Sequence, residues 1–262
     1  MRIRIAAPVL TGALVLGALA VPTAAFAATK GPVITRAVSP SVTLGLGGTI
    51  TLGTTVTATD ASGIKAIYAA PYPLALAQQD GGTPTAADLR SDPADNLLKV
   101  KSSTATSQTA SVLETAKIPA NAKLPNELAG TWGVAVLVVA KDGSTTFNVK
   151  ATTYSWKRAD RLTSKVSATQ VRKGTALTVK GQLNRANWTA DAYQGYAAQP
   201  VLLQFRKTGA STWTTVEQVR SSRTGALSAT VKDTASGSWR YVYAGNSTSG
   251  TAASAQTWVG LK

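Results

Sequence analysis

The sequence contains no cysteine and no histidine among its 262 residues. The missing thiols exclude a disulfide framework and a cysteine nucleophile, and the two absences together exclude zinc sites built from Cys and His. A catalytic triad whose base is histidine is excluded as well. Acidic side chains are scarce, with 12 against 27 basic ones, so the formal net charge is +15. These absences narrow the chemistry without naming an activity.

The first 27 residues are expected to be a secretory signal peptide. Arg2 and Arg4 precede an apolar run over residues 6–19, and residues 25–27 (Ala-Phe-Ala) place small side chains at the −3 and −1 positions of a signal-peptidase site. A transmembrane anchor is the alternative, but the run is shorter than the ~20 residues that span a bilayer. We therefore expect cleavage before Ala28 and a secreted, extracellular protein with no transmembrane segment in the mature chain.

Apolar residues at alternate positions predict antiparallel β-strands throughout the mature chain. The clearest examples are Ile50, Leu52, Val56 and Ala58, then Leu177, Val179 and Leu183, then Trp239, Tyr241 and Tyr243. The run from Trp132 to Ala140 has apolar residues at both odd and even positions, which predicts a central strand covered on both faces. The segment Leu74–Asn96 is the least strand-like, and we expect a helical turn or an irregular insertion there. The fold class predicted is all-β.

Internal similarity divides the mature chain into two halves. Val38-Ser39 followed by Gly48-Thr49 is similar to Val166-Ser167 followed by Gly174-Thr175. Each half also carries a Gly-[Ser/Thr]-Trp triplet before a late strand, at residues 130–132 and 237–239, where a large ring would fill the gap between two sheets. We expect two immunoglobulin-like β-sandwich domains in tandem. They would occupy residues 28–156 and 163–262, joined by a stiff linker at 157–162.

Several longer stretches carry a resemblance to a known family. They are residues 57–64 (TATDASGI) and 129–132 (AGTW) in the first half, then 171–174 (VRKG), 183–188 (LNRANW), 193–196 (YQGY) and 203–207 (LQFRK) in the second. The chain resembles a family of secreted actinobacterial proteins without assigned function. The resemblance implies an immunoglobulin-like tandem outside the cell and transfers no catalytic residues. Some members carry a calcium-binding label, which makes calcium the one cofactor to test.

Calcium sites need six to eight oxygen ligands, usually from closely spaced carboxylates. The one cluster of this kind in a presumed loop comprises Asp80, Asp88, Asp92 and Asp95. Asp60 and Asp142 stand beside Ser and Gly after presumed strands, where Asp typically accepts hydrogen bonds from a turn. No cofactor is expected to be bound, and the alternative is that this cluster is a Ca²⁺ site.

The positive charge is unevenly distributed along the chain. Residues 28–156 hold ten basic and eight acidic groups, a net of +2, whereas residues 157–262 hold fifteen basic and four acidic groups, a net of +11. Such a field concentrates polyanions. The expected partner is an anionic cell-wall polymer or an acidic polysaccharide, with extracellular nucleic acid left open. The alternative is that the cations only keep a sandwich soluble and protect its edge strands.

A segment rich in aromatic residues and arginine in the second half is the candidate ligand-binding site. Arg185, Trp188, Tyr193 and Tyr196 are expected in a long connection between two strands, where rings beside cations suit a sugar or a base. Alternatively, these rings cap the core of the sandwich. The nearby cations complete the predicted ligand-binding set, which is Arg185, Trp188, Tyr193, Tyr196, Arg206, Lys207 and Arg223. Trp213 and Trp258 are interpreted as core or sheet-face residues.

Enzymatic activity is not expected. Glycoside hydrolysis needs two carboxyl groups facing a cleft, and none of the twelve acidic residues lies in a recognisable motif. The sequence therefore favours a non-enzymatic secreted protein whose basic second domain associates with the cell envelope or with an extracellular polyanion. The alternative is a calcium-stabilised structural spacer or adhesin.

Overall fold

The computed structural model describes residues 31–80, 82–117 and 123–262. The described chain is almost entirely β-structure, which confirms the predicted fold class. The expected signal peptide of residues 1–27 lies outside the described residues. Within the described ranges, no helix has both the length and the apolar character needed to cross a bilayer.

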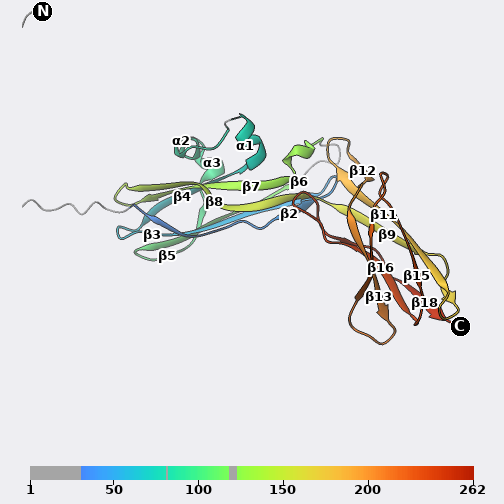
Figure 1. Ribbon diagram of the computed structural model, residues 1–262. Helices are drawn as coiled ribbons and strands as arrows, with labels where there is room; N and C mark the ends of the chain where they lie inside the picture. Colours follow the sequence, from blue (N-terminus) through green and yellow to red (C-terminus); the bar gives the residue numbers. More distant parts are fainter. Residues whose placement is uncertain (1–30, 81, 118–122) are drawn as a thin grey trace, which may run out of the picture. The chain divides into compact units, whose positions relative to one another are not determined.

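The first sandwich consists of two four-stranded sheets (Figure 1). One sheet has the order β1-β3-β6-β5, from β1 (Val33–Val38), β3 (Thr49–Thr59), β6 (Ser107–Lys117) and β5 (Lys99–Ser103). The other has the order β2-β8-β7-β4, from β2 (Val42–Leu44), β8 (Thr145–Arg158), β7 (Gly130–Ala140) and β4 (Ile64–Pro73). Neighbouring strands are antiparallel, except that β2 runs parallel to β8.

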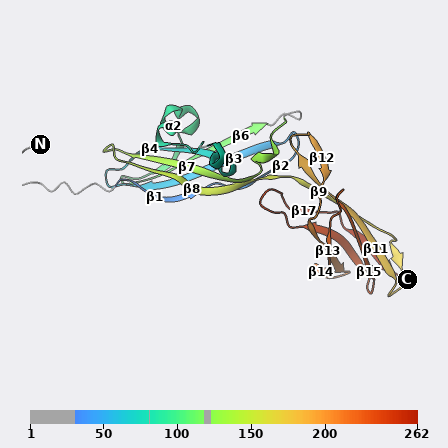
Figure 2. The same ribbon diagram turned by 45° about the horizontal axis from the view of Figure 1, so that its top comes forward.

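Strand β7 is buried on both faces, as the apolar run predicts. Val134, Val136 and Val138 belong to the core between the two sheets. Ala135 and Leu137 face the opposite way, into a second cluster with residues of the helical insertion. This insertion comprises α1 (Leu74–Asp80), α2 (Ala86–Ser91) and α3 (Pro93–Asn96), and both views show α2 lying over β4 and β7 (Figures 1 and 2). The predicted interruption at 74–96 is therefore confirmed, and it covers the outer face of a sheet.

The second sandwich repeats this plan. One sheet pairs β11 (Ala176–Asn187) with β9 (Asp160–Val166) along one side and with β15 (Ala226–Lys232) and β12 (Ala192–Gly195) along the other. The second sheet has the order β10-β18-β16-β13-β14, and β17 pairs with β16. These strands are β10 (Gln170–Val171), β18 (Thr257–Leu261), β16 (Gly237–Tyr243), β13 (Pro200–Lys207), β14 (Thr214–Arg220) and β17 (Ala252–Ala253).

The two sandwiches share an immunoglobulin-like strand order. In each, the first long strand pairs with the third, and a short second strand runs parallel to the last strand, as β2 does with β8 and β10 with β18. The two Gly-[Ser/Thr]-Trp triplets begin β7 and β16, which are equivalent strands. Trp239 is buried in the core of the second sandwich, and Trp132 packs against the core of the first sandwich. The internal similarity of the sequence therefore reflects a repeated architecture.

Strand β8 ends at Arg158 and β9 begins at Asp160, so Ala159 alone separates them. The expected linker at 157–162 thus consists mainly of strand, and its use as a domain boundary stays a prediction. A short 3-10 turn, η1 (Asn126–Leu128), contacts the second sandwich through Asn126, whose side-chain amide donates a hydrogen bond of 2.8 Å to Asn187. Both sandwiches therefore contribute to the packing around this junction.

Candidate ligand-binding face

The segment Arg185–Tyr196 is not a long connection, because it forms the hairpin of β11 and β12. At its turn Trp188 is 2% exposed and packs in one cluster with Leu44 and Ile50. The indole Nε1–H donates a hydrogen bond of 3.1 Å to the carbonyl oxygen of Leu44. The ring of Trp188 is therefore enclosed by residues of both sandwiches, which corrects its prediction as a ligand contact and agrees with the alternative that it caps a core.

The remaining rings of this hairpin are already paired with cations. The guanidinium carbon of Arg185 lies 3.6 Å from the ring centroid of Tyr196, and that of Arg161 lies 3.7 Å from the ring centroid of Tyr193. Arg185 also donates a hydrogen bond of 3.3 Å to Ser249. Each of these arginine side chains therefore packs on a ring of the same sandwich, which favours a structural role for the hairpin.

Asp160 is a half-buried carboxyl beside this hairpin. Both of its carboxylate oxygens are shielded from solvent, beside the Ser249 side chain and the Gly250 backbone. Burial raises the pKa of Asp160 to about 7, and nearby Arg185 and Arg158 offset part of that rise. Burial and the charge of Arg185 in turn lower the pKa of Arg158. The junction therefore holds a carboxyl group that titrates near neutrality.

The carboxylates of the predicted calcium site have structural roles in the helical insertion. Asp88 completes a capping box with Thr85, accepting hydrogen bonds of 2.8 Å from its N–H and 2.7 Å from its hydroxyl. Asp92 caps α3 by accepting from the N–H of Asp95. Among the described residues no group of three or more acidic side chains is placed to hold a metal ion. The side chain of Asp80 lies outside the described residues, so calcium binding stays an untested alternative.

The turn interpretation of the other two aspartates is confirmed. The Ser62 N–H donates a hydrogen bond of 2.8 Å to Asp60, and the Ser144 N–H donates one of 2.9 Å to Asp142. The Ser144 hydroxyl and N–H hold the pKa of Asp142 below its ordinary value. Asp142 therefore stabilises the hairpin turn between β7 and β8, and Asp60 stabilises the turn that joins β3 to β4 of the other sheet.

The cations of the second sandwich do not converge on one point. Arg206 and Lys207 end β13, whereas Arg220 pairs with Pro200 at the other end of that strand, about 20 Å away at 3.3 Å per residue. Arg223 lies in the turn between β14 and β15 and is exposed. The predicted ligand-binding set is thus divided between the hairpin, one end of β13 and the turn of Arg223, whose neighbour Ser221 donates a hydrogen bond to the carbonyl oxygen of Tyr196.

Arg206 belongs to a surface that we call the Trp258 face, the outer surface of β13, β16 and β18, and Lys207 follows it at the end of β13. Three residues of this face are in register across the strands, Arg206 on β13, Ser238 on β16 and Trp258 on β18. Trp258 is 52% exposed, which confirms the sheet-face interpretation of this residue. The sequence singled out neither Ser238 nor Trp258 as a ligand contact, because strands distant along the chain bring them together. The alternation of outward Trp258 with buried Val259 is the signal that marks it.

Next to this row, Trp213 lies against two guanidinium groups. The guanidinium carbon of Arg240 is 4.0 Å from its ring centroid, and that of Arg206 is 4.8 Å away. Arg240 is further fixed by two hydrogen bonds of 2.9 and 3.0 Å to Gln204. Burial, with a contribution from Arg206, lowers the pKa of Arg240. The cations of the Trp258 face are therefore held in place by aromatic and amide contacts.

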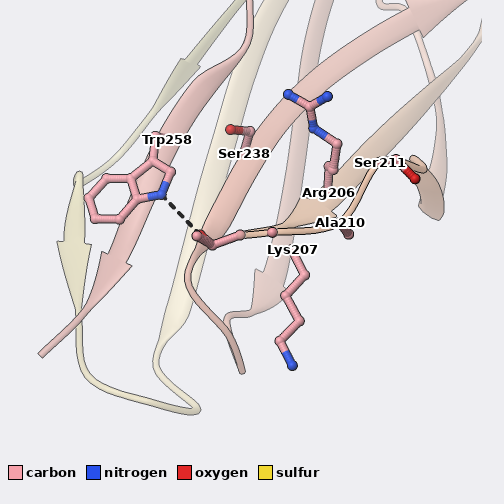
Figure 3. A pocket seen from close by; sticks show the side chains of 8 residues that line it. Arg206, Lys207, Ala210, Ser211, Ser238 and Trp258 are labelled. Atoms are coloured by element: carbon pink, nitrogen blue, oxygen red, sulfur yellow. Dashed lines mark hydrogen bonds between the residues drawn. The ribbon is translucent and has the colours of Figure 1, made fainter.

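A hollow of about 430 Å³ lies at one end of this face (Figure 3). It is lined by Arg206, Lys207, Thr208, Gly209, Ala210, Ser211, Ser238 and Trp258. Figure 3 shows Ser238 between the indole of Trp258 and the side chain of Arg206, with Lys207 leaving the strand in another direction. The lining offers cations, hydroxyls and an indole and contains no carboxylate.

Comparison with known proteins assigns no activity to this chain. No protein-family model and no curated protein matches the chain. Fibronectin(III)-like modules of CbhA from Clostridium thermocellum are 13% identical, with 88% of this chain and 92% of that chain covered and a TM-score of 0.39. A chimeric titin Z1Z2 tandem is 14% identical, with 88% and 99% covered and a TM-score of 0.31. A superoxide reductase from Ignicoccus hospitalis is 13% identical over 40% of this chain and 82% of that chain, at 0.27. At these TM-scores the similarities transfer no function.

Proposed function

We propose that this protein is a non-enzymatic extracellular module whose basic second sandwich associates with an anionic polymer, either a cell-wall polymer or an acidic polysaccharide. The supporting observation is the excess of fifteen basic over four acidic groups in residues 157–262. Of the four acids, Asp233 is 1% exposed and burial raises its pKa, and Asp160 is half-buried. The surface is therefore still more positive than the composition suggests.

The sheet opposite the Trp258 face supports the same proposal. Lys165 and Lys180 are directly opposite each other on β9 and β11, and both are exposed. Like charges at such a pair are destabilising unless a counter-charge is supplied. The hollow beside them, lined by Lys165, Val166, Ser167, Thr178 and Lys180, contains no carboxylate. A polymer carrying regularly spaced negative groups would supply that counter-charge.

Chromatography on immobilised polygalacturonate and pull-down with isolated cell walls test the proposal. The chain from residue 28 onward should bind at low ionic strength and elute as salt screens the attraction. The double variants Lys165→Gln/Lys180→Gln and Arg206→Gln/Lys207→Gln should each elute at lower salt than the parent. Lys99→Gln/Lys101→Gln is the matched control, because it removes two exposed charges from β5 of the first sandwich.

Two results would count against an electrostatic association. One is the absence of retention at low salt on both materials. The other is retention that salt does not weaken, or that falls equally in the β5 control and the second-sandwich variants. In either case the basic side chains serve solubility and edge protection instead.

A further inference from the structure

The indole of Trp258 is an exposed ring held in a fixed position. It projects outward from β18, while its neighbour Val259 is fully buried in the core. Its Nε1–H donates a hydrogen bond of 3.3 Å to the hydroxyl of Thr208, in the turn that follows β13. A large aromatic side chain that is half exposed and yet anchored by its polar atom has a defined orientation before any ligand arrives.

Gly260 gives the ring its place on the strand. A Cβ atom at Gly260 would lie 2.5 Å from Cη2 of Trp258 and 2.9 Å from Cζ3, closer than carbon atoms approach. The benzene part of the indole therefore occupies the space that a side chain at position 260 would fill. One side of the ring packs on the strand, and the ring remains 52% exposed on the side away from it.

The surroundings of this ring match a small polar and anionic ligand. The hollow of about 430 Å³ is within the size range of small-molecule sites. Three hydroxyl side chains line it, those of Thr208, Ser211 and Ser238, together with the cations of Arg206 and Lys207. Arg206 is steadied by a hydrogen bond of 2.9 Å to Gln256. The lining thus combines an apolar ring face, hydroxyls and positive charge.

We propose that the Trp258 pocket binds one sugar ring that carries a negative group, such as a uronic acid or a phosphorylated sugar. The C–H face of the sugar would lie on the indole, because the negative face of an aromatic ring attracts C–H groups. Arg206 would bind the anionic substituent, and Ser238, which lies between Trp258 and Arg206, would bind a hydroxyl. The proposal deepens the polyanion association above by naming the repeating unit that is recognised.

A single-stranded nucleic acid fits this face less well. Such ligands are bound on several rings, each stacking a successive base. On the Trp258 face, Trp213 already has the guanidinium groups of Arg206 and Arg240 against its ring. Among the described residues of this face, Trp258 is therefore the one ring that is available for stacking. A single ring can stack on one repeating unit of a polymer.

The test is titration of the chain from residue 28 onward with trigalacturonate, followed by the indole N–H signal of Trp258 in NMR spectra and by calorimetry. Maltotriose serves as the uncharged probe and a short oligothymidylate as the nucleic acid probe. Trp258→Ala should weaken trigalacturonate binding about ten-fold or more, the effect expected for the loss of one stacked ring. Arg206→Gln should weaken it as well. Gly260→Ala should also weaken it, because the added Cβ displaces the ring.

Lys99→Gln/Lys101→Gln is the control, because it removes two exposed charges from β5 of the first sandwich and should leave the affinity unchanged. Each variant is accepted only with the melting temperature of the parent. The proposal is overturned if Trp258→Ala binds trigalacturonate as the parent does, if maltotriose binds equally well, or if oligothymidylate binds more tightly at Trp258.

The two proposals fail in different ways. If the parent is retained on polygalacturonate while trigalacturonate leaves the Trp258 signal unmoved, the pocket is refuted and the polymer association stands. If trigalacturonate binds at Trp258 while retention is absent at low salt, the polymer association is refuted and the pocket stands.

Discussion

Replacement of Trp188 by alanine should separate the unfolding of the two sandwiches. The ring is 2% exposed and lies among residues of both sandwiches, including Leu44 and Ala186. A buried indole removes about 200 Å² from water, which at about 25 cal/mol per Å² corresponds to about 5 kcal/mol. Measured losses for core Trp→Ala changes are about 3–5 kcal/mol. We expect a loss in this range, because the ring also hydrogen-bonds to Leu44.

Urea denaturation followed by far-UV circular dichroism measures this effect. The parent should unfold in one transition and Trp188→Ala in two, because the ring joins the sandwiches. A double-mutant cycle with Leu44→Ala isolates the contact and should give a coupling free energy of about 1–3 kcal/mol. Trp258→Ala is the matched control, since an exposed Trp should change stability by no more than about 0.5 kcal/mol.

Two outcomes would refute the reasoning about Trp188. A loss of less than about 1 kcal/mol would show that the ring is not enclosed as described. Additive effects of Trp188→Ala and Leu44→Ala would show that the two side chains do not share one packing cluster.

Three further predictions concern titration, metal and a buried hydrogen bond. Because burial raises the pKa of Asp160 to about 7, its contribution to stability should be intact below about pH 4 and lost as pH rises to about 7. Asp160→Asn should therefore increase the free energy of unfolding at pH 8 by on the order of 1 kcal/mol, because the carboxylate is partly solvated, and the melting temperature should rise with it. At pH 3.5 the melting temperature should be unchanged. A gain of the same size at pH 3.5 would contradict this. Millimolar Ca²⁺ or a chelator should leave the melting temperature unchanged, because Asp88 and Asp92 cap helices. A rise with Ca²⁺ that Asp92→Asn abolishes would instead support the calcium alternative. Tyr241→Phe should lower the free energy of unfolding in urea by about 1–3 kcal/mol, because the fully buried hydroxyl donates a hydrogen bond of 2.8 Å to the carbonyl oxygen of Val179. An unchanged midpoint would show that this hydrogen bond contributes nothing to stability.

The strands could be predicted from the sequence because alternation along one strand is a local property. Leu177 and Val179 face the core as their spacing indicates, and both Gly-[Ser/Thr]-Trp triplets begin equivalent strands. The burial of β7 on both faces was also predicted, although its cause was not. That cause is the packing of Leu89 in the helical insertion against Leu137, which no periodicity reveals.

The candidate site was predicted less well, because its contacts are long-range. Aromatic and cationic residues close in sequence suggested the segment around Trp188, but the partner of that ring is Leu44, 144 residues away. The Trp258 face is assembled from three strands, and the sequence had marked only Arg206 on it, and Lys207 beside it, as ligand contacts. A local pattern therefore found the cations and missed the ring beside them.

The helical insertion over β4 and β7 has a consequence for the dynamics of the first sandwich. Amide groups of β7 lie beneath helices on one side and beneath a second sheet on the other. Deuterium can reach them only when a covering layer detaches, so the slowest-exchanging amides of this sandwich should be those of Ala135–Val138. The capping box at Thr85 and Asp88 helps to keep the outer layer closed, and its removal should accelerate exchange there first.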